Sequence, residues 1–425
     1  MLDLKFLRRH PDVVKAGSLK KRIPCDVDRI LELDASHREL GVQIDELRSR
    51  QKAAGAAIAK ATPEERKVLL ADQTELKSGL KDLEAEQSGI DEELKALLLL
   101  VPMPPAAEVP DGKTDEDNVE LRKVGTPRTF DFEPRSHIEI GEQQDWLDIE
   151  RGARLAGSRN YVLKGDLSLL EHAVMRYALD LMVGRGFTSV SVPTLVRRSA
   201  MEGTGYFPGG EDQAYGTDER DDLFLVGTSE VPLTALYQGE ILEQSALPVK
   251  MVALSQCYRR EAGTYGKDTK GLYRVHQFLK VEQVVLDIAD DARSLEHHAQ
   301  ILQNAEDLLQ AFDLPYRVVN VCGGDLGQGQ VQKFDIETWM PSREGYGETH
   351  SASRFHDFQS RRLDLRYRDD DGKVHHCHSL NNTVAASTRL LIALVENHQT
   401  ADGQVAVPEA LQPYIGGRTL LGKVL

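Results

Sequence analysis

Hydrophobic residues in the first hundred positions of the chain recur at alternating spacings of three and four. One such ladder runs from Ile30 to Ile58, and a second runs from Leu69 to Leu97. A repeat of this kind forms an apolar seam along one side of a helix and is typical of a coiled coil. The pattern therefore predicts two long helices that pack against each other or against partners.

The short segment between the ladders, Thr62-Pro-Glu-Glu65, resembles the start of a helix. It offers a threonine as N-cap, a proline at the first helical position and a glutamate three residues after the cap. The second helix should begin here, and so short a connection makes the two helices antiparallel. At about 1.5 Å per residue, about 34 residues would form an arm roughly 50 Å long.

The helical pattern ends at Val101-Pro-Met-Pro-Pro105, and a polar stretch from Asp111 to Asp117 follows. Prolines and glycines at this density break helices and mark a linker. We expect a domain boundary in this region, with an N-terminal coiled-coil domain over residues 1–105 and a second domain over residues 106–425.

Beyond the linker, helical segments alternate irregularly with β-rich runs. The predicted helices are Leu167 to Arg185, Asp290 to Ala311 and Thr388 to His398, and the predicted strands are Ser189 to Val192, Leu223 to Val226, Val281 to Leu286, Val318 to Val321 and Phe334 to Trp339. Because this order is not a repeating βαβ unit, it favours a mostly antiparallel sheet flanked by helices. The predicted fold class is therefore α+β.

The composition narrows the class of protein. Of 425 residues, 40% are hydrophobic and 28% are charged, which are ordinary globular values, and no apolar run of bilayer-spanning length occurs. The N-terminal sequence lacks the apolar stretch of a signal peptide, and four scattered cysteines (Cys25, Cys257, Cys322, Cys377) have neither disulfide nor zinc spacing. We expect a cytoplasmic protein without membrane segments and without zinc.

A net charge of −16 argues against a protein that coats nucleic acid with its whole surface. The distal part of the predicted arm, from Leu47 to Lys81, has the opposite balance. It contains four acidic and eight basic residues, the latter being Arg48, Arg50, Lys52, Lys60, Arg66, Lys67, Lys77 and Lys81. Lysine and arginine displace condensed counterions from phosphates, so this tip could contact a polyanion. A dimerisation coiled coil or a spacer with ordinary charged faces is the alternative.

Two stretches of the second domain have candidate catalytic chemistry. Arg259 and Glu261 lie two residues apart beside a glycine-punctuated loop, and on a strand they would point into one site. Arg389 lies in the first turn of an apolar helix, where its charge opposes the helix dipole. An anionic ligand near Arg389 would explain that position.

Six segments occur in an order that matches a known family. Three segments are class-wide, namely Ala178 to Pro193, Arg259 to Glu261 with its loop, and the run containing Arg389. The other three are family-specific, namely Gly227 to Pro232, Arg274 to Glu282, and Glu348 to Ser351 ahead of Asp357 to Arg362. Together with the basic hairpin, they make the chain resemble a bacterial-type seryl-tRNA synthetase, a class II aminoacyl-tRNA synthetase. The resemblance covers essentially all of the chain.

The resemblance implies an ATP site. Arg259 would contact the α-phosphate and the serine carboxylate, Glu261 the adenine amino group and Phe278 the adenine ring, while Arg274 and Arg389 would hold the phosphate tail. Arg259 and Arg389 are the implied catalytic residues, and Arg260, Val275, Thr349 and His350 complete the implied ATP-binding set. Glu348 and Ser351 would coordinate Mg²⁺, a hard cation that prefers oxygen ligands.

The resemblance also implies a serine pocket. Thr228 and Glu230 would bind the ammonium group, with Ser229 between them, and Glu282 and Thr383 would surround the substrate hydroxyl. A pocket that satisfies this hydroxyl penalises alanine, because the polar groups are then left unpaired. Threonine would have to be excluded by its size.

The implied reaction is activation of L-serine with ATP to seryl-adenylate, followed by transfer of serine to the 3′ end of tRNA(Ser), and in this family also of tRNA(Sec). A homodimer through the first class-wide motif is expected. One alternative is a non-catalytic synthetase-like RNA-binding protein, which should have lost Arg259, Glu261 or Arg389. A second is a stand-alone paralogue that activates an amino acid for a carrier protein, which should lack the long arm.

Two further motifs do not indicate cofactor sites. Four consecutive residues, His375-His-Cys-His378, cannot converge on one ion from an extended strand, because alternate side chains face opposite ways. The run from Gly323 to Gly329 lacks the spacing of a dinucleotide-binding fingerprint and precedes a predicted strand rather than a helix. We expect structural roles for both.

Overall fold

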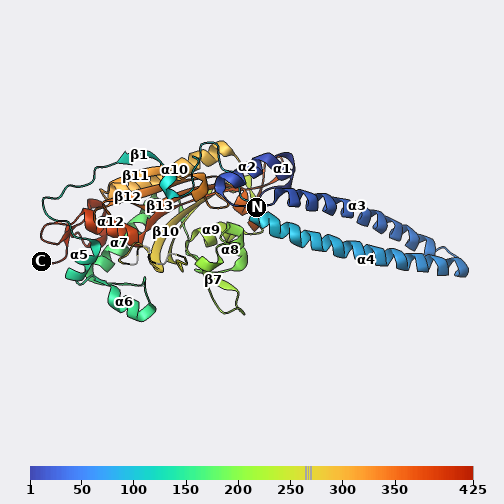
Figure 1. Cartoon of the computed structure of the whole chain (residues 1–425), viewed down its shortest axis with the longest axis horizontal. Helices are drawn as coiled ribbons and strands as arrows, with labels where there is room; N and C mark the ends of the chain where they lie inside the picture. The colour runs from blue at the N-terminus through green and yellow to red at the C-terminus, as the bar shows by residue number, and fades with distance from the viewer. Residues whose placement is uncertain (264–265, 267, 269, 425) are drawn as a thin grey trace. The chain divides into compact units, whose positions relative to one another are not determined.

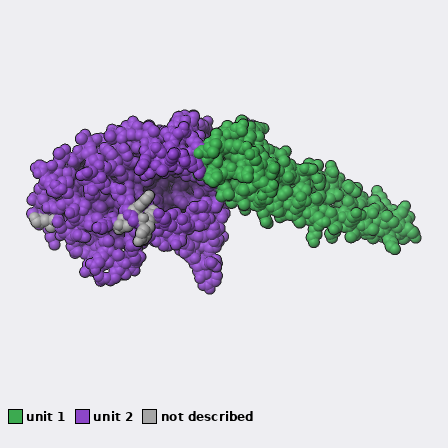
Figure 2. Space-filling model, viewed as in Figure 1, with its two compact units in different colours: residues 1–19, 23–104 green, residues 20–22, 105–425 purple. Residues whose placement is uncertain are grey.

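A computed structural model of the chain describes residues 1–263, 266, 268 and 270–424. Part of the loop after Glu261, which belongs to the second class-wide motif, lies outside these residues. The chain forms two compact units (Figure 2). One unit comprises Met1–Leu19 and Ile23–Pro104, and the other comprises Lys20–Arg22 and Pro105–Leu425.

The first unit is helical. Its helices are α1 (Leu4–Arg9), most of α2 (Pro11–Lys21), α3 (Val27–Ile58) and α4 (Pro63–Leu100). Helices α3 and α4 pack side by side as a long antiparallel hairpin (Figure 1). The heptad prediction is confirmed, since most of the buried side chains lie on the predicted seam, namely Ile30, Leu33, Leu40, Ile44 and Leu94.

The predicted helix start at Thr62 is also confirmed. The Glu65 carboxylate accepts hydrogen bonds from the Thr62 backbone N–H at 3.0 Å and from the Thr62 hydroxyl at 2.8 Å. The bond from the Thr62 N–H to Glu65 is a capping-box contact, and Pro63 occupies the first position of the helix. Between the helices, Arg48 of α3 donates to Glu84 of α4 at 2.8 Å, which fixes the register of the hairpin.

The second unit is built on an eight-stranded sheet with the strand order β1-β11-β12-β13-β16-β10-β9-β4. Its strands are β1 (Val119–Val124), β4 (Thr188–Ser189), β9 (Val249–Tyr258), β10 (Gln277–Asp287), β11 (Tyr316–Asn320), β12 (Gln332–Met340), β13 (Gly345–His356) and β16 (His378–Ala386). All neighbouring pairs are antiparallel except β4 and β9, which are parallel. The predicted antiparallel sheet is therefore confirmed.

Helices lie on both faces of this sheet. The helices of the unit are α5 (His137–Gln143), α6 (Ile149–Ala156), α7 (Gly165–Gly184), α8 (Arg198–Thr204), α9 (Glu230–Thr234), α10 (Asp291–Ala311), α11 (Phe358–Leu363) and α12 (Ser387–Asn397). Helices α7, α10 and α12 share one apolar core with Val281 and Val285 of β10. Because side chains alternate along a strand, Lys280 and Glu282 face the other side of the sheet.

Four small sheets complete the unit. They are formed by β5 (Leu195–Arg197), β7 (Leu223–Leu225) and β6 (Tyr215–Gly216); by β15 (Val374–His376), β14 (Arg366–Arg368) and β8 (Ile241–Glu243); by β2 (Leu147–Asp148) and β3 (Val162–Leu163); and by β17 (Val405–Ala406) and β18 (Leu420–Leu421). Among the described residues, no helix is long and apolar enough to cross a bilayer.

The strand predicted over Ser189 to Val192 is shorter than expected. Only Thr188–Ser189 is a strand, although the Val190 N–H still donates to the Val252 carbonyl at 2.8 Å. Pro193 follows closely and has no N–H to extend the ladder.

Candidate active site

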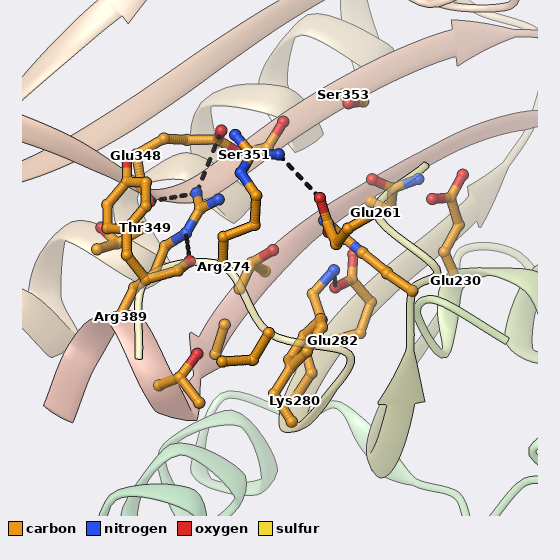
Figure 3. Close-up of a pocket in the computed structure, with 18 of the residues that line it drawn as sticks. Glu230, Glu261, Arg274, Lys280, Glu282, Glu348, Thr349, Ser351, Ser353 and Arg389 are labelled. Atoms are coloured by element: carbon orange, nitrogen blue, oxygen red, sulfur yellow. Dashed lines mark hydrogen bonds and ion pairs between the residues drawn. The ribbon is translucent and has the colours of Figure 1, made fainter. Parts of the chain in front are cut away.

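A cavity opens on the face of the sheet opposite the core helices (Figure 3). Strands β10, β13 and β16, the segment between β9 and β10, and the first turn of α12 provide most of its wall. Twelve of the residues expected from the sequence line it, namely Glu230, Arg259, Glu261, Arg274, Val275, Phe278, Glu282, Glu348, Thr349, Ser351, Thr383 and Arg389. The ATP and serine sets thus occupy one cavity.

Four expected residues are not part of its wall. The Ser229 hydroxyl is buried and contacts the Ser255 hydroxyl at 2.9 Å and the Ala253 carbonyl, so it points into the protein. The Thr228 hydroxyl lies just behind the wall, where it accepts from Lys280 Nζ at 3.0 Å. The His350 ring contacts Thr349 and the Val384 carbonyl, and burial lowers its pKa to about 4. The Arg260 N–H donates to the Gln213 carbonyl at 3.0 Å.

The expected strand under Arg259 and Glu261 is wrong. Strand β9 ends at Tyr258, and Glu261 has a φ of 52°, in the left-handed region. The two side chains meet in the cavity because the chain bends, and not because they share a strand face. Here the Glu261 carboxylate accepts from Arg274 Nη1 at 2.8 Å, and the Arg259 guanidinium lies 5.3 Å from the centre of the Phe278 ring.

Arg389 marks the opposite end of the cavity from Glu230 and Glu282 (Figure 3). Its Nε donates to the Tyr273 carbonyl at 3.1 Å, and its Nη1 donates to the Glu348 carbonyl at 2.6 Å. The guanidinium also lies over the Tyr273 ring at 4.4 Å. These contacts hold a cation in the first turn of α12, where the free N–H groups of the helix add positive potential. This end of the cavity suits an anion.

Glu348 and Ser351 lie on one strand, three residues apart, and regular alternation would place them on opposite faces. A β-bulge in β13 changes this. Ser351 pairs with Asp335 and His350 with Ile336, but Glu348 pairs with Glu337, so that Thr349 is an extra residue. Both Glu348 and Ser351 consequently line the cavity.

The two side chains offer a carboxylate and a hydroxyl to the cavity. Burial would raise the pKa of Glu348, but the positive charges of Arg389, Lys333 and Arg259 outweigh that effect and lower it. The carboxylate is therefore ionised at neutral pH. A charged carboxylate beside a hydroxyl fits a hard divalent cation that keeps water and phosphate in its shell.

The residues of the His375–His378 motif have partners of other kinds. His375 contacts the Asp369 carboxylate at 2.8 Å, and His378 Nδ1 contacts the Ser294 hydroxyl at 2.7 Å. The motif is divided between β15 and β16. In the part of the chain that the structure describes, no group of three or more histidine, cysteine or acidic residues is arranged to hold a metal ion.

Glu282 and Thr383 form the second polar group of the cavity. They are cross-strand partners on β10 and β16. Glu282 also pairs with Lys280, which lines the cavity two residues earlier on the same strand face. Burial raises the pKa of Glu282, and the neighbouring Lys280 ammonium opposes the shift.

Glu230 lies at the start of α9 and is buried. Its carboxylate accepts from the Tyr206 hydroxyl at 3.0 Å and from Gln359 Nε2 at 2.8 Å. Burial, reinforced by the negative charge of Glu282, raises the pKa of Glu230 to about 7. Two buried carboxylates in one pocket favour a cationic ligand, which would neutralise them.

Eight cavity residues were not expected from the sequence, namely Tyr206, Tyr273, Lys280, Gln330, Ser353, Asn381, Ala386 and Thr388. Lys280 lies just before the strand predicted from Val281, and the observed strand β10 includes it and places it on the same face as Glu282. Ser353 and Asn381 share their strand faces with Ser351 and Thr383, on strands β13 and β16 that the sequence did not predict. Nothing in the sequence near Tyr206 or Gln330 indicates that these residues reach the cavity.

Comparisons with known proteins agree with this arrangement. Residues 1–105 match the seryl-tRNA synthetase N-terminal domain, and residues 214–398 match the tRNA synthetase class II core domain (G, H, P, S and T). The serine–tRNA ligase of Deinococcus radiodurans is 48% identical over 100% of this chain and 99% of its own length. That of Thermobifida fusca is 44% identical over 98% of both.

Solved structures show the same likeness. Seryl-tRNA synthetase from Pyrococcus horikoshii, complexed with ATP, superposes with a TM-score of 0.93 at 37% identity over 100% of both chains. The cytoplasmic serine–tRNA ligase of Naegleria fowleri, in complex with AMP, superposes with a TM-score of 0.88 at 31% identity over 99% of both chains. With relatives this similar over the whole length, the chain belongs to the seryl-tRNA synthetase family, and it is a serine–tRNA ligase that aminoacylates tRNA(Ser).

Proposed function

We propose that the cavity binds ATP and L-serine side by side and forms seryl-adenylate without a covalent enzyme intermediate. The observation that supports this most directly is the division of the cavity into a cationic part, with Arg259, Arg274 and Arg389, and an acidic part, with Glu230 and Glu282. A triphosphate suits the first part and an ammonium group the second. The Pyrococcus relative is complexed with ATP and the Naegleria relative with AMP, which supports a nucleotide in this fold.

In the proposed reaction, a carboxylate oxygen of serine attacks the α-phosphorus of ATP and pyrophosphate leaves. Such a step needs reactants that are aligned and negative charge that is neutralised, more than it needs an acid or base. Arg259 would contact both the α-phosphate and the attacking carboxylate. Its guanidinium lies over Phe278, so an adenine stacked on Phe278 would present its phosphates to Arg259.

The remaining phosphates would lie toward Arg274 and Arg389. An arginine fork matches two phosphate oxygens at once, which a lysine cannot do. In the structure each of these two guanidiniums pairs with a carboxylate, Arg274 with Glu261 at 2.8 Å and Arg389 with Glu348 at 3.4 Å. Bound ATP would take over these arginine contacts in part, leaving Glu261 for the adenine amino group and Glu348 for a cation.

Mg²⁺ would be held by Glu348 and Ser351, which fit it by charge and by ligand type. Bound there, the ion would neutralise phosphate charge. Around it, Arg389 keeps the Glu348 side chain and main chain in place, and Thr349 bonds to the Thr338 hydroxyl at 2.7 Å, which fixes the bulge.

The ammonium group of serine would contact Glu230, with Thr228 contributing through Lys280. The serine hydroxyl would lie between Glu282 and Thr383. In the second step, a ribose hydroxyl of the terminal adenosine of tRNA attacks the seryl carbonyl and AMP leaves. We propose tRNA(Sec) as a further acceptor, and charging assays with separate tRNA(Ser) and tRNA(Sec) transcripts would test it.

The basic hairpin tip is the proposed tRNA contact. All eight of its basic side chains are exposed, and only Arg48 has an acidic partner within 4.0 Å among the described residues. We accordingly assign tRNA binding to residues 1–105 and catalysis to residues 106–425, except for Lys20–Arg22, which belong to the catalytic unit. Retention of the arm and of Arg259, Glu261 and Arg389 leaves both alternative functions without support.

A homodimer is also proposed. Strand β4 of the first class-wide motif lies at an edge of the large sheet, and Leu169 and Val183 of the adjoining helix α7 are half exposed. An open sheet edge beside exposed apolar side chains is a surface that a second copy can cover. Light scattering should give the mass of two chains. A cytoplasmic location is proposed because the Naegleria relative is a cytoplasmic enzyme.

The activation step is tested by serine-dependent exchange of pyrophosphate into ATP. Exchange with serine, and far less with alanine, threonine or cysteine, is expected. Absence of serine-dependent exchange in folded protein would overturn the proposed reaction, while equal exchange with alanine would overturn the proposed hydroxyl contacts.

A further inference from the structure

Lys21 lies far from the catalytic segments in sequence but belongs to the same compact unit. It is only 2% exposed, which is unusual for a lysine. Its ammonium donates to three backbone carbonyls, those of Gly327 at 3.0 Å, Gln328 at 2.9 Å and Gln330. An ammonium has three donors, so these carbonyls satisfy it completely.

The loop that Lys21 holds ends at the cavity. Gln330 lines the cavity, and its Nε2 donates to the Ser353 hydroxyl at 2.8 Å while its Oε1 accepts from the Gly327 N–H at 2.7 Å. The side chain is thus anchored at both ends of its amide. Gly329 adds a steric constraint, because a Cβ there would lie 2.4 Å from the Phe358 ring.

Gln330 lies on the side of the cavity formed by β13 and β16. Its partner Ser353 stands opposite Asn381 across β13 and β16. Asn381 and Thr383 are two residues apart on β16 and both line the cavity. Gln330, Ser353, Asn381 and Thr383 therefore form one continuous polar wall beside the position proposed for the serine hydroxyl.

We propose that Gln330 is a specificity-determining residue of the serine pocket, and that Lys21 is a positioning residue that holds it there. This inference rests on the proposed placement of serine at Glu282 and Thr383. A tethered glutamine beside the hydroxyl limits the room for an added methyl group, which is what separates threonine from serine. Because the tether comes from α2, the pocket depends on a residue outside the segments that form its wall.

In the described part of the chain, Lys21 is held by backbone carbonyls and not by an ion pair. No carboxylate lies within salt-bridge distance of the Lys21 Nζ among the described residues. The three carbonyls are its sole described polar contacts, and loss of the amine would remove the contacts that join α2 to this loop. The loop should shift when Lys21 is replaced, and Gln330 should shift with it.

The test is pyrophosphate exchange with Gln330→Ala, Lys21→Met and the double variant. For each single variant we expect KM for serine to rise about tenfold, KM for ATP to stay within about twofold, and relative exchange with threonine to increase. The KM for serine of the double variant should not exceed that of the more impaired single variant, because both changes remove the same restraint.

Lys20→Met is the matched control. Lys20 precedes Lys21 on the same helix, and its Nζ lies 3.3 Å from the Asp111 carboxylate rather than on the loop. This variant removes the same charge and should retain the wild-type KM for serine. Ser353→Ala, which removes the acceptor of Gln330 Nε2, should reproduce the Gln330→Ala pattern and serves if Lys21→Met does not fold.

The outcomes distinguish the proposed reaction from the proposed roles of the two residues. Wild-type protein without serine-dependent exchange would overturn the reaction itself. Wild-type exchange together with an unchanged KM for serine and unchanged threonine exchange in Gln330→Ala would overturn only the specificity role. Equal increases in the KM values for serine and ATP in Lys21→Met, or additive effects in the double variant, would overturn the positioning role.

Discussion

Glu282 of β10 and Thr383 of β16 face each other directly across two antiparallel strands at the floor of the cavity. Cross-strand partners have side chains about 5 Å apart, so their oxygens can reach one small polar group from two sides. A single hydroxyl is such a group. This pairing is the geometric basis of the proposed preference for serine over alanine.

Replacing Thr383 by valine tests that pairing, because valine keeps the shape of threonine and lacks its hydroxyl. We expect kcat/KM for serine in pyrophosphate exchange to fall by roughly 5- to 150-fold, since a hydrogen bond lost in a buried site costs about 1 to 3 kcal/mol. Exchange with alanine should stay within about twofold. If both substrates lose activity equally, Thr383 supports the fold and does not contact the hydroxyl.

Glu230 should make serine binding pH-dependent. Burial and the charge of Glu282 raise the pKa of Glu230 to about 7, and an ammonium group binds the ionised carboxylate. Below that pH the carboxyl is protonated, so kcat/KM for serine should rise as pH increases from about 5.5 to 8 and then level off. KM for ATP should not change over this pH range.

The variant Glu230→Gln keeps the size of this side chain but cannot ionise, and it offers one acceptor oxygen instead of two. Serine exchange should be weak in this variant and its pH profile flat over the same range. A profile that keeps its inflection in Glu230→Gln would assign the titration to another group of the cavity.

Glu348 and Ser351 should determine the response to Mg²⁺. In Glu348→Gln, the concentration of Mg²⁺ that supports half-maximal exchange should rise by about tenfold or more, because an ionised ligand is lost. Ser351→Ala should shift it in the same direction but less, since a neutral ligand is lost. Asp325→Asn is a useful comparison, because Asp325 is an acidic residue that does not line the cavity. An unchanged Mg²⁺ response in Glu348→Gln would contradict the proposed site.

The hairpin tip should be needed for tRNA and dispensable for activation. Replacing residues 49–83 by a short glycine-containing turn removes seven of the eight basic side chains and leaves the Arg48–Glu84 pair at the new end. Pyrophosphate exchange should stay within about twofold of wild type, and aminoacylation of tRNA(Ser) should be lost. Equal loss of both activities would contradict this division of labour.

Charge can be separated from shape at the same tip. Arg66→Gln with Lys67→Gln should weaken tRNA binding and reduce its dependence on salt, because fewer counterions are released from the tRNA. Asp72→Asn with Glu75→Gln on the same helix removes two charges of the opposite sign and should not weaken binding. Similar losses from both pairs would indicate damage to the helix.

The sequence was sufficient for features that depend on local spacing. The heptads from Ile30 to Ile58 and the capping residues from Thr62 to Glu65 are patterns of neighbouring residues, and the structure confirms both. Most of the cavity wall could also be predicted, because ordered segments such as Arg274 to Glu282 resemble a known family and fold into adjacent strands.

Features that depend on distant segments could not be predicted. Lys21 and Gln330, which are 309 positions apart in the sequence, meet only through tertiary structure. The bend after Tyr258 overrides the alternation expected for Arg259 and Glu261, because backbone pairing ends there. Ser229 lies between Thr228 and Glu230 in the sequence, yet its hydroxyl forms a hydrogen bond with the Ser255 hydroxyl.

The extra residue in β13 also limits how the length of the protein can vary. Loss of Thr349 would straighten the strand and leave Glu348 and Ser351 two positions apart, still on the cavity face, at the expense of the hydroxyl bond to Thr338. A deletion at Ala352 or Ser353 would instead rotate every later side chain of the strand to the opposite face. Insertions and deletions in this strand should therefore be tolerated, if anywhere, at position 349.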